Sequence, residues 1–168
     1  MRFDNLSDLP EWDDNEFNDE AEEGERWKPN PTKDACKAMY MQWQQVMMML
    51  KGALETMQVK DEPEEAEMPV DFWDDYKQTI IGDAYEVAVK IKSSEVGLYT
   101  IRMENASIIR KNAQYIYSSL LTLMIENVIE ESYVRAIRSE IDTFRELFKQ
   151  WVATFQKDEY IDEWGLFI

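Results

Sequence analysis

Four stretches of this chain place apolar side chains at alternating intervals of three and four residues, which is the spacing of one face of an α-helix. They span residues 32–57, 70–91, 99–123 and 134–155. The last stretch is the most regular, with Val134, Ile137, Ile141, Phe144, Phe148, Trp151 and Phe155 on the predicted face. A helix with one apolar face needs other apolar faces to cover it. The spacing therefore predicts an all-α protein whose four helices share one core.

The breaks between these stretches predict how the helices connect. Thr32 follows a proline and is a candidate N-cap for the first helix, and the acidic, proline-containing segment 58–69 follows that helix. Short turns near residues 93–97 and 127 join the remaining helices, and short turns connect antiparallel neighbours. The expected architecture is an up-down-up-down four-helix bundle across residues 32–156.

A β-hairpin competes with this prediction in one place. Large apolar residues recur at every second position over residues 87–91 and again over 99–103, on either side of a glycine-containing turn. We favour helices because the helical spacing continues beyond both ends of the alternating segment. Gly82 lies inside the predicted second helix, where glycine costs about 1 kcal/mol relative to alanine. We therefore expect another helix to approach the chain closely at Gly82.

Acidic residues are concentrated outside the predicted helices. The chain has 35 acidic and 18 basic residues, and a formal net charge of −17. Residues 1–31 hold eleven acids and three bases, and residues 157–168 hold four acids and one base. We divide the chain into an irregular acidic N-terminal segment (1–31), a four-helix bundle (32–156) that is nearly neutral outside its acidic connection 58–69, and an apolar C-terminal tail (157–168). Without a basic face, neither nucleic acid nor an anionic membrane is an expected partner.

The residue types that the chain lacks exclude several kinds of chemistry. It has no histidine, which excludes Ser-His-Asp and Cys-His nucleophiles and mixed His/Cys zinc sites. Its single cysteine, Cys36, cannot form an internal disulfide, and a reduced thiol suits the cytoplasm. The predicted apolar faces contain no cluster of carboxylates that would predict a metal site, and no cofactor is expected. Enzyme activity would need a lysine or carboxylate base in a pocket, so we regard a catalytic role as unsupported.

Neither end of the chain nor its interior predicts a membrane segment. The first residues are acidic, unlike the basic and then apolar order of a signal peptide. The longest stretch without charge, residues 112–125, has 14 residues and contains Asn, Gln, Ser and Thr. It is too short and too polar to cross a bilayer. We therefore expect a cytoplasmic protein.

The candidate ligand-binding residues lie on or beside the faces of the second and third helices. If these helices are antiparallel and joined by a turn near residues 94–97, a residue of one lies beside a residue of the other when their numbers sum to about 190. Asn105 would then lie near Glu86, and Arg102 near Ala88. The set comprises Arg102, Glu104, Asn105, Arg110 and Glu86. These side chains could line a cavity for a small anion, but we favour a network in which they pair with one another.

Aromatic residues among the acids make both ends candidate interaction segments. The candidates are Trp12, Phe17, Trp164, Leu166 and Phe167. We favour a disordered N-terminal segment whose last aromatic, Trp27, packs on the domain, over one that folds onto a partner. Gly165 permits a sharp turn, which would let the tail fold back over its own bundle or enter a groove on a second copy. We favour the fold-back.

The stretch 98–114, reading LYTIRMENASIIRKNAQ, resembles an uncharacterised family of bacterial helical proteins. The resemblance covers the second to fourth predicted helices and implies no activity. The sequence thus predicts a non-catalytic protein–protein interaction or scaffold module that binds an unknown protein or itself. The alternatives are a binder of a small anionic ligand between the second and third helices and, more weakly, a nucleic-acid mimic.

Overall fold

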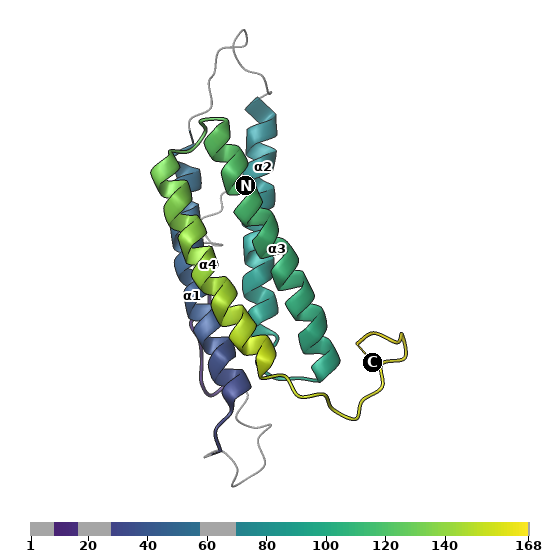
Figure 1. The fold of residues 1–168 in the computed structure, drawn as a ribbon. Helices are drawn as coiled ribbons and strands as arrows, with labels where there is room; N and C mark the ends of the chain where they lie inside the picture. The colour runs from purple at the N-terminus through teal and green to yellow at the C-terminus, as the bar shows by residue number, and fades with distance from the viewer. Residues whose placement is uncertain (1–8, 17–27, 58–69, 168) are drawn as a thin grey trace.

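The computed structural model describes residues 9–16, 28–57 and 70–167, and four α-helices account for most of them. They are α1 (Pro31–Glu55), α2 (Val70–Lys92), α3 (Tyr99–Ile125) and α4 (Glu131–Ala153), shown in Figure 1. Each predicted apolar stretch forms one helix, and the described residues contain no strand. The all-α four-helix prediction is therefore confirmed, and the alternative hairpin is wrong.

The four helices form a closed ring. α1 packs against α2 and α4, and α3 packs against the same two helices, with the α1–α4 and α2–α3 interfaces the larger ones. Consecutive helices run in opposite directions (Figure 1). Each helix thus buries its apolar face against two neighbours, as expected of a four-helix bundle. None of the helices in the described ranges combines the length and apolar character needed to cross a membrane.

The core follows the predicted apolar faces. In α1, Trp43 is fully buried, its indole Nε1 donates a hydrogen bond to the Ala84 carbonyl at 2.8 Å, and its ring lies 4.7 Å from that of Phe144. One side chain therefore links three helices. The buried residues of α4 are Val134, Ile137, Ile141, Phe144 and Trp151, all from the predicted stripe.

Two local expectations are wrong. The N-cap of α1 is Asn30, whose side chain accepts a hydrogen bond from the Lys33 amide at 3.0 Å, whereas Thr32 lies within the helix and donates to the Thr154 carbonyl. Gly82 is exposed, and a methyl group added there would meet no atom within 4 Å. No helix approaches it, so this glycine lies on the solvent face of α2.

Candidate functional site

The predicted pairing of α2 and α3 is displaced by about eight residues, or two helical turns. Asn105 donates hydrogen bonds to the hydroxyls of Ser94, at 3.0 Å, and Ser93, at 3.4 Å, instead of lying near Glu86. Glu86 instead accepts a hydrogen bond from Asn112 at 2.6 Å. Level positions therefore sum to about 198 rather than 190. The reason is that α3 begins beyond the end of α2 (Figure 1), so that its second turn lies beside the connection.

The five predicted ligand-binding residues do not gather at one place. Arg102 is half-buried and donates to the backbone carbonyls of Ser94 and Glu95, at 3.2 and 3.3 Å. Its partial burial lowers the pKa of the Arg102 guanidinium. Glu104 and Arg110 are exposed, and Arg110 faces α4 rather than α2. We favoured a network in which these five side chains pair with one another. Among the described residues, Arg102, Asn105 and Glu86 instead bind residues outside the set.

α3 instead presents a column of buried polar side chains, of which only Asn105 was among the candidates named from the sequence. Asn105, Asn112 and Ser119 are spaced seven residues apart and are 5%, 0% and 2% exposed. Positions seven apart share one helix face. Asn105 donates to Ser94 and Asn112 donates to Glu86, whereas the buried Oδ1 of Asn112 has no hydrogen-bond partner among the described residues. The seven-residue spacing of these polar residues could have predicted that they share one face of α3. The apolar positions beside them dominate the pattern of the same helix.

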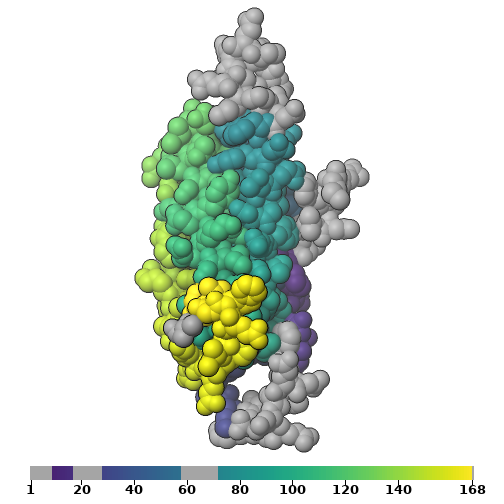
Figure 2. Space-filling model, turned by 90° about the vertical axis from the view of Figure 1, so that its right-hand side faces the viewer, coloured from purple at the N-terminus to yellow at the C-terminus, as the bar shows by residue number. Residues whose placement is uncertain are grey.

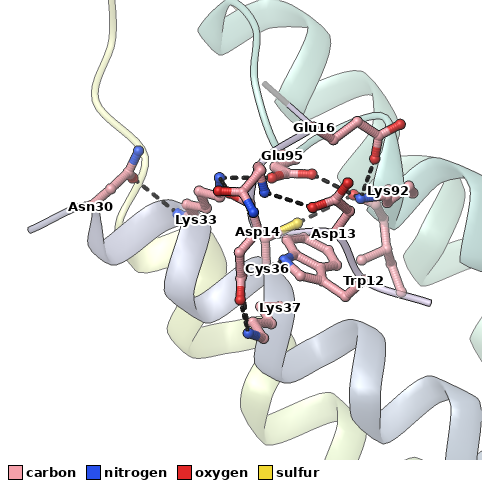
Figure 3. A network of polar contacts seen from close by, with 12 residues as sticks. Trp12, Asp13, Asp14, Glu16, Asn30, Lys33, Cys36, Lys37, Lys92 and Glu95 are labelled. Carbon is pink, nitrogen blue, oxygen red and sulfur yellow. Dashed lines mark hydrogen bonds and ion pairs between the residues drawn. The ribbon is translucent and has the colours of Figure 1, made fainter. Parts of the chain in front are cut away.

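Glu95 is the centre of a second polar cluster, at the end of the bundle where α1 begins and α2 ends (Figure 3). Its side chain is completely buried and forms ion pairs with Lys33 and Lys92, both at 3.0 Å. Lys33 also donates to the Asp14 carbonyl at 3.0 Å. Glu95 was not among the residues singled out from the sequence, because a glutamate within Ser-Ser-Glu-Val-Gly is typical of a solvent-exposed turn. Its partner Lys33 lies far away along the chain.

The cluster holds part of the N-terminal segment against the bundle. Trp12 packs on Tyr40 with ring centroids 5.5 Å apart, and the Lys92 ammonium lies 4.3 Å from the indole. The Tyr40 hydroxyl donates to the Pro10 carbonyl at 2.7 Å. Residues 9–16 are therefore docked, which corrects the expectation of a disordered leader for this part. Phe17 and Trp27 lie outside the described residues.

Acidic side chains of the same segment complete the cluster. Asp14 pairs with Lys37 and Glu16 pairs with Lys92, at 2.8 and 2.7 Å. The hydrogen bond from Lys37 lowers the pKa of the Asp14 carboxyl below its usual 3.8. Burial alone would lower the pKa of Lys92, but its bonds to Glu16 and Glu95 raise it above the usual 10.5. Each charge in the cluster thus has a partner of opposite sign.

The one thiol in the cluster is not arranged as a nucleophile. Cys36 is fully buried and donates to the Ile91 carbonyl at 3.2 Å. Burial, reinforced by the charge of Glu95, raises the pKa of the thiol to about 12. A reactive cysteine needs a lowered pKa and access to solvent. The described residues also contain no group of three or more acidic, histidine or cysteine side chains placed to hold a metal ion.

A groove between α3 and α4 has a different character. It encloses about 280 Å³, and Ile141, Phe144 and Phe148 contribute apolar surface. Arg110, Arg145 and Lys149 contribute cationic groups. Arg145 pairs with Asp142 at 2.7 Å and Lys149 with Glu146 at 2.8 Å, whereas Arg110 pairs with none of the described acids. In this acidic protein, the groove is a local positive site beside apolar side chains.

The C-terminal tail lies beside the first turn of α3. The Tyr99 amide donates to the Asp158 carboxylate at 2.8 Å, and Leu166 and Phe167 line a small cavity with Tyr99. Trp164, however, is 88% exposed. The tail does fold back to its own bundle, but the expected covering of the core by Trp164 is wrong. Figure 2 shows the tail as a distinct yellow patch on the surface beside α3.

Comparison of the chain with protein-family models, with curated proteins and with solved structures found no match. Function is therefore inferred from the residues themselves. Two acidic segments that contain a tryptophan are relevant to binding. Residues 9–16 are docked on the bundle, and residues 157–167 carry the exposed Trp164.

Proposed function

We propose that this chain is a non-catalytic protein–protein interaction module and that its C-terminal segment, residues 157–167, is the contact surface. The observation that carries the proposal is the exposure of three large apolar side chains close together in sequence: Ile161 at 76%, Trp164 at 88% and Leu166 at 53%. Tryptophan is enriched among the residues that contribute most to protein interfaces. An exposed apolar group of this kind gains free energy when a partner covers it.

The local backbone supports a recognition role for this segment. The Gly165 amide donates to the Asp162 carbonyl at 3.0 Å, and the Leu166 amide donates to the Asp162 carboxylate at 2.8 Å. Gly165 has φ of +73°, a conformation that glycine adopts without steric cost. These contacts form a tight turn with Trp164 near its tip. A turn that is already formed loses less conformational entropy when it binds.

The other expected functions have less support. A small anionic ligand between α2 and α3 has less support, because the side-chain amides of Asn105 and Asn112 already donate hydrogen bonds within that interface. The Asn112 Oδ1 atom, which has no partner among the described residues, is an acceptor and would not bind an anion. Catalysis is disfavoured by the burial and raised pKa of Cys36. The formal net charge of −17 disfavours nucleic acid as a partner. A cytoplasmic location is part of the proposal, since a single buried thiol needs no oxidising compartment.

Site-specific photocrosslinking in the native cells tests the proposal. A benzophenone amino acid replaces Trp164 in the full chain, and the matched control replaces Tyr133, which is 49% exposed on α4. We expect a protein adduct of defined mass from position 164 and a much weaker one from position 133. Equal yields from the two positions, or no adduct from position 164, would overturn the proposal.

A further inference from the structure

We infer that the partner of the C-terminal segment is a second copy of this chain, whose groove between α3 and α4 receives Trp164. This inference rests on the proposed function, because it identifies what the contact surface binds. It joins two features that the fold leaves separate, an exposed acidic aromatic turn and an apolar groove with cationic groups. Each chain carries both features, so two copies can satisfy each other through a twofold, self-complementary contact.

The chemistry of the groove matches that of the turn. Phe148 is partly exposed and offers aromatic surface beside the buried Phe144, and Arg110, Arg145 and Lys149 also line the groove. An indole gains free energy from apolar contact and from cations placed over its face. The flanking Glu159 and Glu163 are exposed acids that can pair with these cations. Arg110, which pairs with no described acid of its own chain, is the natural first partner.

The same pairing of chemistries already occurs once within the molecule. Trp12 lies against Tyr40 with the Lys92 ammonium 4.3 Å from its ring, and its neighbours Asp14 and Glu16 pair with Lys37 and Lys92. An acidic segment with one tryptophan thus docks where lysines lie beside a buried aromatic ring. The α3–α4 groove offers the equivalent surface, and within the described ranges only residues of α3 and α4 line it.

The tail of the same chain is held at a different place. Asp158 binds the Tyr99 amide, and Phe167 lines the cavity beside Tyr99, so both sides of the turn are held at the start of α3. Arg110 lies eleven residues further along α3, about 16 Å at 1.5 Å per residue. Trp164 faces away from its own bundle with most of its surface exposed. A second copy can reach the groove without breaking these contacts.

Sedimentation velocity over a concentration series of the full chain tests the inference. We expect a reversible dimer whose dissociation constant rises about tenfold or more in Trp164→Ala and in the groove double variant Arg110→Glu with Lys149→Glu. The matched control is Lys111→Glu with Arg135→Glu, which makes the same charge change on the same two helices. Both control residues are exposed and neither lines the groove, so this variant should dimerise like the parent chain.

A charge exchange gives the decisive result. Adding Glu159→Lys and Glu163→Lys to the groove double variant should restore the dimer, because the two sets of charges are then reversed together. A monomer at all concentrations, or a dimer that the groove double variant leaves intact, would overturn the inference. If Trp164→Ala abolishes the dimer and the groove double variant does not, the groove is wrong while the proposed contact surface stands. If the chain is monomeric, the crosslinking at position 164 still decides the proposed function.

Discussion

The two ends of the described chain carry the same kinds of residue and meet the bundle in different ways. Residues 9–16 and 157–167 are both acidic and each contains one tryptophan. Trp12 is partly buried and lies 5.5 Å from Tyr40, whereas Trp164 is 88% exposed. The difference is in what each segment meets. The first meets three lysines and a buried aromatic ring, and the second meets the backbone amide of Tyr99 and a small cavity.

This comparison indicates what an acidic aromatic segment needs in order to dock on the bundle. Aspartate and glutamate bring little stability to an exposed surface. Lysines next to apolar surface can receive both the acids and the indole, and Lys92 does this for Glu16 and Trp12 together. At the start of α3, the charge of Arg102 interacts with Asp158, but the Arg102 guanidinium donates its hydrogen bonds to the carbonyls of Ser94 and Glu95. We therefore expect residues 9–16 to contribute to the stability of the fold and the tail to remain available for the proposed contact.

Removing the charge of Glu95 should have the largest effect on the difference between the two ends, because it weakens the docking of residues 9–16. The variant Glu95→Gln keeps the size of the side chain but leaves Lys33 and Lys92 without their buried partner. We expect the free energy of unfolding to fall by about 3 kcal/mol, since the change removes the carboxylate partner of Lys33 and one of the two carboxylate partners of Lys92. Denaturant titration followed by circular dichroism measures this. Both lysines also bind the segment 9–16, which should become more accessible to proteolysis.

Glu104→Gln is the matched control for this change. Glu104 undergoes the same chemical substitution on the neighbouring helix, but its side chain is exposed. We expect a change within about 0.5 kcal/mol. Similar losses in the two variants would show that burial of Glu95 contributes nothing to stability.

The two tryptophans give the most direct test of the difference between the ends. Trp12→Ala should lower the free energy of unfolding by about 2 kcal/mol, because it removes partly buried apolar surface and the contact with Lys92. Trp164→Ala should change the stability of the monomer by less than about 0.5 kcal/mol. Thermal melts at a concentration that keeps the chain monomeric compare the two. A larger loss in Trp164→Ala would mean that the tail belongs to the core.

The helices could be predicted from sequence because their signal is local. Each apolar stripe, such as Val134 to Trp151, repeats within one helix and needs no knowledge of its neighbours. The pairing of α2 with α3 depended on how the connection runs, and a displacement of about two turns moved Asn105 from Glu86 to Ser94. Arg102 was expected to pair with other candidate side chains, but its partners are the backbone carbonyls of Ser94 and Glu95.

The candidate sites were harder to predict because their members are far apart in the chain. Glu95 meets Lys33, and Trp12 meets Tyr40 and Lys92. No spacing rule within one helix relates such residues. Arg110 was identified as a functional candidate, but its cationic neighbours Arg145 and Lys149 lie on α4 and became evident only when α3 and α4 were packed together.

The smallest expected effect is a release of residues 9–16 by acid. The hydrogen bond from Lys37 lowers the pKa of Asp14 in the folded chain below the usual 3.8. A carboxyl group with a lowered folded pKa contributes stability above its unfolded pKa and loses that contribution as the pH falls through the folded value. The contribution of Asp14 is therefore complete at neutral pH and is lost only below about pH 4. Because Asp14 is exposed, its protonation should have little effect on the unfolding of the whole chain. The measurement must therefore report on residues 9–16 alone.

The fluorescence of Trp12 supplies that signal when the spectrum of Trp12→Phe is subtracted from that of the parent chain at each pH. We expect the difference spectrum to stay constant from neutral pH to about pH 4 and then to shift to the red as the indole leaves Tyr40 for water. In Asp14→Asn, which has no carboxyl to titrate, the shift should be partly present at neutral pH and should change less on acidification. Identical titrations of the parent chain and Asp14→Asn would mean that Lys92 and Glu95, rather than the Asp14–Lys37 pair, hold this segment on the bundle.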